Sequence, residues 1–455
     1  MAGNKTKSIS IASMPLTRRG CYIVAVSSME QIIGAGLSTV IGIMLPMIQL
    51  VTQPQMPSAL QGFIGATGLI GIAVGSMIIG KLSDRQGYLK WFRICPILIM
   101  VGALISYFLT DTPCLIAGLL IAGIGVGGGY SLDSAYISEL LPEKWRQIMV
   151  GVAKASCSLG FIVVALLCWL ILSKDPNPKI WNRLMLIIAA SGLLTLLLRI
   201  NWAESPRWLL SKGKTAMAQA ALEKFYGPGV AIAPQPLLPQ AKSNVGIAQM
   251  FHGENFKRVI FSGIPWACEG LGVYGFGVFL PVLVMALGIE SSSVEGMPKI
   301  IDSVKVTTLV NFFILPGFII GLLLMNRLNH VRLLSLGFIG SAVGLGILYA
   351  GYVFHMPDLV MIIGFIIFEI TLNAGPHLIT YIIPSRIYPV EDRGTGTGIA
   401  AMIGKVGAVT GVIIMPILLE AGGAKLVLIV SFFVMIAGAA ISLIYGKALN
   451  LINNN

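Results

Sequence analysis

The sequence predicts an all-α membrane protein in which twelve transmembrane helices form two six-helix bundles. Hydrophobic residues make up 56% of the 455 residues and charged residues only 11%, far below the roughly 25% charged residues of a typical soluble domain. The apolar residues lie in continuous runs of about 20, the length that a helix needs to cross a bilayer. They do not alternate with polar residues, as the strands of a membrane barrel would. One long polar stretch, residues 202–257, divides the runs into six and six.

In chain order, the runs predict helices near residues 21–50, 58–80, 93–110, 114–138, 148–172, 183–201, 258–288, 304–325, 332–354, 358–383, 396–419 and 424–446. The first and seventh runs exceed one crossing, so we expect those helices to be tilted, kinked or partly outside the bilayer. The polar break predicts an N-terminal bundle over 1–201, a cytoplasmic linker over 202–257 and a C-terminal bundle over 258–455.

Lysine and arginine predict the orientation. If the N-terminus is cytoplasmic, the cytoplasmic segments hold 22 of these residues and the outer segments hold 5. Because cytoplasmic loops are enriched in basic residues, both termini are expected in the cytoplasm. We expect the chain to be integral to the plasma membrane, the inner membrane of a bacterium. The basic residues that give the net charge of +12 are scattered between apolar runs and form no stripe, so we expect the bilayer, and no nucleic acid, as the partner. We expect the protein to be a monomer.

Neither catalysis nor metal binding is indicated. The six cysteines show no CxxC spacing, which argues against a zinc site or a disulfide framework. No Ser/His/Asp or metal-ligand arrangement is evident outside the apolar runs, so we expect no enzyme activity, no metal and no cofactor.

Four segments resemble a known family. GKLSDRQGYLK at 80–90 resembles the loop signature of the major facilitator superfamily. The segments at 123–147, 204–214 and 388–408 are similar to its sugar porter and metabolite–proton symporter branch. The resemblance implies secondary active transport, in which two repeated halves expose a central site to alternate sides of the membrane. A small-molecule substrate and protons are the implied partners.

The resemblance also implies a cytoplasmic gate of charged side chains near the inner ends of the helices. In this branch the glutamates and arginines of the loops after helices 4 and 10 pair across the two halves. Arg386 stands where the pattern usually has a glutamate. The implied gate residues are Asp84, Arg85, Glu139, Arg146, Glu204, Arg207, Arg386 and Arg393.

A run of glycines in the fourth predicted helix satisfies a second motif. Gly123, Gly125 and Gly128 match the GxGxxG dinucleotide fingerprint, which requires a preceding strand. Here the run lies inside an apolar segment, where glycines allow helices to approach closely. We therefore interpret it as helix packing.

Ionisable residues inside apolar runs are candidate functional groups, because each costs about 2.5–3.5 kcal/mol to insert. Buried carboxyl groups without a basic partner tend to take up protons, which a proton-coupled carrier requires. We expect the ionisable side chains to converge on one central chamber. The proton-coupling candidates are Glu30, Asp133, Glu269 and Glu369.

Glu30 lies where sugar porters carry an acid that binds the coupling proton. The helix 4 arginine that pairs with this acid in the family is replaced by Leu119, so the sequence predicts that Glu30 has lost its base. An alternative is that Glu30 only hydrogen-bonds between helices. For Asp133, a polar contact near the inner mouth is likewise the alternative to a role in transport.

The substrate-binding candidates differ from those of a hexose carrier. Sugar porters place amide side chains in helices 5 and 7, whereas the matching positions here hold Lys154, Cys268, Glu269 and Tyr274. Organic-anion carriers of the superfamily have an arginine where this chain has Lys405. The alternatives are that Cys268 and Tyr274 pack, that Lys154 extends toward the membrane surface, and that Lys405 pairs with Glu369 or Glu269.

Two further residues complete the candidate site. His377 could line the cavity or could be a lone, hydrogen-bonded imidazole. Trp266, like Tyr274, could stack on an aromatic substrate or pack in the core.

The leading hypothesis is proton-coupled symport of a small polar metabolite, an organic anion or a zwitterion. A sugar or polyol symporter is the first alternative, and a drug–proton antiporter is the second. A non-transporting sensor is a third, which the short linker and termini disfavour.

Overall fold

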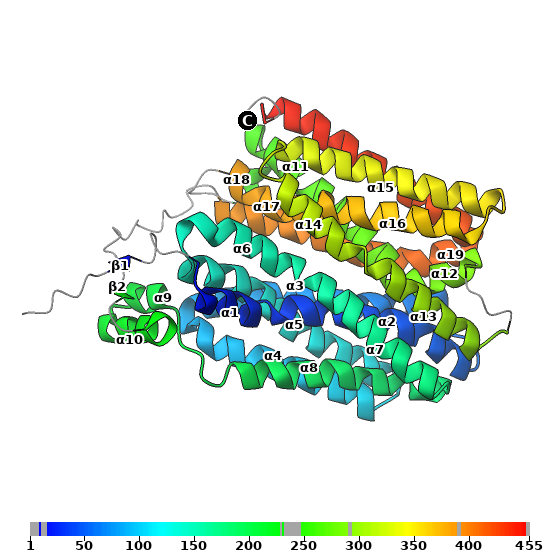
Figure 1. Cartoon of the computed structure of the whole chain (residues 1–455), viewed down its shortest axis with the longest axis horizontal. Helices are drawn as coiled ribbons and strands as arrows, with labels where there is room; N and C mark the ends of the chain where they lie inside the picture. The colour runs from blue at the N-terminus through cyan, green and yellow to red at the C-terminus, as the bar shows by residue number, and fades with distance from the viewer. Residues whose placement is uncertain are drawn as a thin grey trace, which may run out of the picture.

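The computed structural model describes residues 9–10, 16–227, 230–231, 247–289, 294–388 and 393–451, and nearly all of them are helical (Figure 1). The elements are β1 (Ile9–Ser10), α1 (Arg18–Ser27), α2 (Met29–Val51), α3 (Ser58–Gln86), α4 (Tyr88–Phe108), α5 (Thr112–Leu140), α6 (Glu143–Ala155), α7 (Cys157–Lys174), η2 (Pro178–Leu184), α8 (Met185–Leu198), α9 (Pro206–Ser211), α10 (Thr215–Tyr226), β2 (Val230–Ala231), η3 (Ile247–Phe251), α11 (Gly253–Gly270), η4 (Leu271–Phe276), α12 (Leu280–Leu287), α13 (Met297–Asn311), α14 (Ile314–Leu324), α15 (His330–Val353), α16 (Asp358–Ala374), α17 (Pro376–Ile382), α18 (Pro384–Ile387) and α19 (Arg393–Ala448).

The described residues contain twelve membrane crossings, as the sequence predicts. Ten helical segments are long and apolar enough to cross a bilayer, and the bent pair of 253–276 and 280–287 makes an eleventh. Helix α19 has 56 residues, about 84 Å at 1.5 Å per residue, against a hydrocarbon core of about 30 Å. Its backbone leaves the helical region at Gly422 and Gly423, so α19 is two crossings joined by a tight turn.

Four of the crossings are interrupted next to candidate site residues. The first breaks at Ser28, between α1 and α2, two residues before Glu30. The fifth breaks at Ser156, between α6 and α7, two residues after Lys154. The seventh widens into the π-helix η4, which contains Tyr274, and then bends by 66°. The tenth breaks at Gly375, with φ −111° and ψ −88°, before a proline that cannot donate a backbone hydrogen bond. Such interruptions are frequent at functional sites, because they redirect side chains and free backbone groups.

The helices form two layers, with α1–α8 in one and α11–α19 in the other (Figure 1). We call these the N-terminal and C-terminal halves. The short helices α9 and α10 lie at one end of the N-terminal half, the linker end. They are held there by an aromatic cluster in which the Trp202 ring lies 5.5 Å from Phe225 and 6.1 Å from Tyr136.

The glycine run of α5 is a packing surface, as interpreted. A Cβ atom at Gly123 or Gly127 would overlap the backbone carbonyl of Gly68 or Ile72 in α3. Only glycine allows the two backbones to approach so closely. The run follows no strand, so the context of a dinucleotide site is missing.

The loop between α3 and α4 explains the place of Glu204, one residue of the predicted gate. Gly87 has φ 95°, a conformation that favours glycine. The carboxylate of Glu204 accepts hydrogen bonds from the backbone amides of Tyr88 at 2.9 Å and Leu89 at 3.0 Å. Glu204 therefore caps the N-terminus of α4, where a negative charge is favourable.

Candidate functional site

A buried ion pair joins Glu30 to Arg199 in the N-terminal half. Both guanidinium Nη atoms donate to the Glu30 carboxylate at 2.5 Å, and both side chains are fully buried. Arg199 also donates to the backbone carbonyls of Val26 at 2.8 Å and Phe92 at 3.2 Å, and its guanidinium lies 4.5 Å from the Phe92 ring centre. A forked, charge-assisted pair with these additional partners compensates the cost of desolvating both charges.

Helix α5 accommodates this pair and adds a second acid. A Cβ atom at Gly129 would overlap the Glu30 side chain, so the glycine makes room for it. One turn later, Asp133 is 2% exposed, and its carboxyl group lies beside Gln31 and within Coulombic range of Glu30 and Arg199. One guanidinium thus faces two carboxyl groups. We call Glu30, Asp133 and Arg199 the N-terminal acid cluster.

The prediction that Glu30 lacks a base was wrong. Leu119 does replace the expected helix 4 arginine, but Arg199, the C-cap residue of α8, supplies the positive charge. A cation is favourable at a helix C-terminus, and α8 packs against both α2 and α4. Arg199 was missed because an arginine at the end of an apolar run has the pattern of an ordinary membrane-flanking charge.

A second group of polar side chains lies between the two halves. Lys154 on α6 and Tyr130 on α5 come from the N-terminal half, and the others come from the C-terminal half. Among the titratable groups, Glu269 lies within Coulombic range of both Lys154 and Lys405. We call this group the central cluster; it comprises Tyr130, Lys154, Glu269, Tyr274, His377, Tyr381 and Lys405.

Aromatic rings hold both lysines of the central cluster. The Lys405 ammonium lies 5.5 Å from the ring centre of Tyr130 and 5.2 Å from that of Tyr274. The Lys154 ammonium lies 5.9 Å from the ring centre of Tyr381. Both lysine side chains are half-buried. Ring faces attract ammonium groups without neutralising them, so the lysines keep their charge available for an anion.

A polar chain runs from Glu269 into the C-terminal half. Nε2 of His377 lies 3.6 Å from the Glu269 carboxylate, and Nδ1 of His377 lies 2.8 Å from Oδ1 of Asn373. The Asn373 amide donates to the Glu369 carboxylate at 3.0 Å. All four side chains are buried. Asn373 was missed because a neutral amide carries no charge signal in an apolar run. Its spacing of four from Glu369 places these two residues on one face of α16.

The remaining binding candidates differ in their placement. The Trp266 ring packs on Gly404 and lies 6.2 Å from the Tyr381 ring in an edge-to-face arrangement, which brings it beside the central cluster. Cys268 lies in the hydrophobic core, as in the packing alternative. Lys154 extends toward the other half and not toward the membrane surface, since Tyr381 belongs to α17.

The expectation of one central chamber was wrong in part, because the ionisable groups form two clusters. Glu269, His377 and Lys405 share the central cluster, whereas Glu30 belongs to the N-terminal acid cluster. Tyr130 connects them, because its phenol group lies within Coulombic range of both Tyr274 and Asp133. Glu30 is separate because its carboxylate is fully engaged by Arg199.

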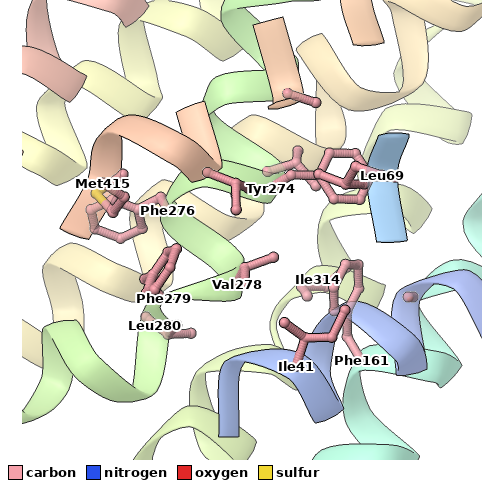
Figure 2. Close-up of a cluster of buried hydrophobic side chains, with 14 of the residues drawn as sticks. Ile41, Leu69, Phe161, Tyr274, Phe276, Val278, Phe279, Leu280, Ile314 and Met415 are labelled. Atoms are coloured by element: carbon pink, nitrogen blue, oxygen red, sulfur yellow. The ribbon is translucent and has the colours of Figure 1, made fainter. Parts of the chain in front are cut away.

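An apolar cluster closes the interface beyond the central cluster, away from the linker end. Ile41, Leu69 and Phe161 of the N-terminal half lie in one cluster with Tyr274, Val278 and Ile314 of the C-terminal half (Figure 2). A Cβ atom at Gly42 would overlap the backbone carbonyl of Val278. Asn311 also donates to the Phe161 carbonyl across the interface at 3.2 Å. The halves are therefore in close contact on this side.

At the linker end, Glu139 and Arg386 of the predicted gate have contacts within their own halves. Glu139 accepts hydrogen bonds from the hydroxyl groups of Tyr88 and Ser205 and lies within Coulombic range of Arg207. Arg386 lies 3.4 Å from Nδ1 of His330. Arg85 is exposed and Arg146 is half-buried, while the side chains of Asp84 and Arg393 lie outside the described residues. Pairing of the gate across the halves stays a prediction.

Comparison with known proteins identifies the family. The family model described as "Sugar (and other) transporter" matches residues 22–447. The chain belongs to this family. The inner membrane metabolite transport protein YgcS of Escherichia coli is 26% identical over 450 residues, covering 98% of this chain and 96% of that protein. The niacin transporter NiaP of Acinetobacter baylyi is 25% identical over 410 residues, covering 88% of each chain.

Solved structures support the same fold. The xylose transporter XylE of E. coli, in a partially occluded inward-open conformation, matches with a TM-score of 0.76 at 19% identity, covering 93% of this chain and 97% of that chain. The predicted resemblance to the sugar porter branch of the major facilitator superfamily and the twelve-helix fold are confirmed. The chain is an integral membrane transporter of the sugar and metabolite type, and its relatives are transporters, not enzymes.

Proposed function

We propose that this transporter moves a small organic anion or zwitterion together with protons, by alternating access. The observation that carries the proposal is the pair of lysines at the interface of the halves. Lys154 and Lys405 come from opposite halves and lie within Coulombic range of each other. Among the described residues, the carboxyl group within Coulombic range of both is that of Glu269. Two ammonium groups and one carboxylate leave a net positive charge that suits an anionic ligand.

An anion between these lysines would couple binding to movement of the halves. A carboxylate about 4 Å from an ammonium group gains about 4 kcal/mol at an effective dielectric constant of about 20. Contact with both lysines requires the halves to be close together, because each half contributes one of them. The bound anion therefore stabilises an occluded state, through which the substrate passes from one side to the other.

The rings around the site favour a planar substrate. Trp266, Tyr274 and Tyr381 lie beside the two lysines, and aromatic rings gain from stacking on flat apolar groups. One relative is named as a niacin transporter, and niacin is an aromatic carboxylic acid. The phosphate permease of Neurospora crassa, 20% identical over 412 residues, is named for another anion.

A sugar or polyol remains the second candidate, since a relative of Arabidopsis thaliana is named as a plastidic glucose transporter. The tyrosine hydroxyls and the Asn373 amide could bind neutral hydroxyl groups. A drug–proton antiporter is disfavoured, because a cationic drug would meet two ammonium groups.

Substrate binding tests the proposal directly. Purified protein is screened by thermal shift against carboxylates, including nicotinate, and against hexoses and organic cations, since a ligand that binds the folded state raises its melting temperature. We expect carboxylates to stabilise the protein and hexoses and cations to leave it unchanged. Lys405→Met should weaken carboxylate binding about 10- to 100-fold, the effect of losing about 1.5–3 kcal/mol, and Lys405→Arg should retain part of it.

Lys425→Met is the matched control, since Lys425 is an exposed lysine on the same element, α19. It should bind carboxylates as the unmodified protein does. Stabilisation by hexoses alone, or carboxylate binding that Lys405→Met leaves unchanged, would refute the anion site.

The arrangement in the membrane is part of the proposal. We infer a monomer with bundles over 1–201 and 258–455, a linker over 202–257 and both termini in the cytoplasm. Impermeant thiol reagents applied to intact cells should then leave a single cysteine introduced at Lys212 of the linker unlabelled, in a cysteine-free background; labelling there would reverse the orientation.

A further inference from the structure

We propose that Glu269 and His377 together bind the coupling proton, and that Asn373 orients His377 for this role. The inference rests on the proposed anion symport and assigns its proton to a specific pair of atoms. Three observations on the polar chain of the C-terminal half support it: the orientation of the Asn373 amide, the unpaired Nε2 of His377, and the two lysines beside Glu269.

The Asn373 amide determines which nitrogen of His377 carries hydrogen. Its Nδ2 lies 2.8 Å from the Glu369 carbonyl oxygen and 3.0 Å from the Glu369 carboxyl oxygen. The reversed amide would place an oxygen against both of these oxygens, so the nitrogen belongs there. Oδ1 of Asn373 therefore faces His377 and accepts a hydrogen bond from Nδ1 at 2.8 Å. The neutral imidazole is held as the Nδ1–H tautomer.

This tautomer points a lone pair toward Glu269. Nε2 of His377 has no hydrogen-bond partner among the described residues, and the Glu269 carboxyl oxygen lies 3.6 Å away. Both side chains are nearly fully buried, at 2% and 3% exposure. A buried lone pair facing a buried carboxylate is unfavourable, whereas one proton shared between them satisfies both atoms. That proton lies either on Glu269, as a carboxylic acid, or on Nε2, as an imidazolium beside a carboxylate.

The groups around this pair link its proton to the substrate. When the proton leaves, the Glu269 carboxylate can interact with the two lysines. When an anion binds to those lysines, it replaces Glu269 as their partner, and Glu269 must then take up a proton from His377 or from water. Anion and proton therefore bind together, one of each. The Phe318 ring packs 5.1 Å from His377, and the ionisable groups facing the pair are Lys154, Cys157, Tyr274, Glu369, Tyr381 and Lys405.

The first experiment tests the tautomer without any substrate. The full-length protein, with ring-¹⁵N histidine, is placed in lipid vesicles, and His377→Gln identifies the His377 signals among those of the four histidines. We expect every neutral His377 to carry its hydrogen on Nδ1, with Nε2 protonated only in the imidazolium form. Asn373→Leu removes the acceptor and should give a mixture of tautomers. A neutral His377 with hydrogen on Nε2 in the unmodified protein would overturn the proposal.

The second experiment separates transport from coupling. Proteoliposomes with nicotinate as the probe are assayed for exchange at equal pH and for accumulation under an inward proton gradient, after subtraction of protein-free liposomes. At one proton per anion, a gradient of about one pH unit supports about tenfold accumulation. Glu269→Gln and His377→Gln should exchange at a reduced but measurable rate and lose accumulation beyond equal concentrations. Glu420→Gln, a matched change of an exposed glutamate, should retain both.

The possible results separate the two proposals. If the unmodified protein neither exchanges nor accumulates nicotinate or any other carboxylate of the screen, the anion transport and the coupling both fail. If it exchanges without accumulating, the anion site stands and proton coupling fails. If Asp133→Asn loses accumulation while Glu269→Gln keeps it, the coupling proton belongs to the N-terminal acid cluster and this inference is wrong.

Discussion

The pair of Glu30 and Arg199 should contribute to stability only when both partners are present. Arg199→Gln would leave a fully buried carboxylate without its base, and Glu30→Gln would leave a buried guanidinium without its acid. Breaking a buried ion pair by removing one partner costs about 3–5 kcal/mol. In the double variant neither partner of the pair leaves the other unpaired. The main losses are that of the base beside Asp133 and that of the hydrogen bonds to the Val26 and Phe92 carbonyls, each about 1 kcal/mol.

We therefore expect the double variant to be at least as stable as either single variant, with a coupling energy of about 3 kcal/mol or more. Melting temperatures of detergent-solubilised protein, followed by intrinsic fluorescence, measure the three variants against the unmodified chain. Arg183→Gln is the control, because its bridge to Asp175 at 3.3 Å is exposed at 58% and 48% and should contribute about 1 kcal/mol or less. Additive losses in the double variant would refute the interpretation of a structural ion pair.

Three further predictions concern the backbone and the linker end. Gly87→Ala should lower the melting temperature by the equivalent of about 1–2 kcal/mol, because φ is 95° there; an unchanged melting curve would contradict this. Gly42→Val should slow nicotinate exchange, since the valine side chain would separate the halves at the Val278 carbonyl. Gly277→Ala is the control and should leave exchange intact, because a Cβ atom there would meet nothing within 4 Å. Equal exchange rates for the two variants would contradict this. Burial raises the pKa of Tyr226 from 10 to about 12. The contribution of the protonated phenol to the free energy of unfolding is therefore complete below pH 10 and is lost as pH rises through 12. Tyr226→Phe should flatten that part of a stability–pH curve, and a curve of unchanged slope would exclude Tyr226 as its source.

Local sequence information predicted the architecture well. Runs of about 20 apolar residues are visible without any tertiary contact, because lipid requires every backbone group of a crossing to be satisfied within its own helix. The glycines at 80–90 and 123–129 also indicated the family from the sequence alone, because the tight turns and close helix contacts that they allow are local features of the chain. Lys154 and Lys405 were recognised because a charge in an apolar run is costly wherever it finally lies.

The partners of those charges were decided by packing. Arg199 lies 169 positions after Glu30. In the sequence it has the position of a membrane-flanking residue at the end of α8, and only the packing of α8 against α2 and α4 places it beside Glu30. Glu269 and His377 lie on α11 and α17, and the interruption of the tenth crossing at Gly375 lies between Asn373 and His377. The sequence by itself determined which side chains must be buried, since hydropathy is a property of each segment alone. The tertiary structure decided which of them pair, because pairing depends on the distances between helices. The energy of a hydrogen bond or of a close ion pair changes strongly when that distance changes by a few ångströms.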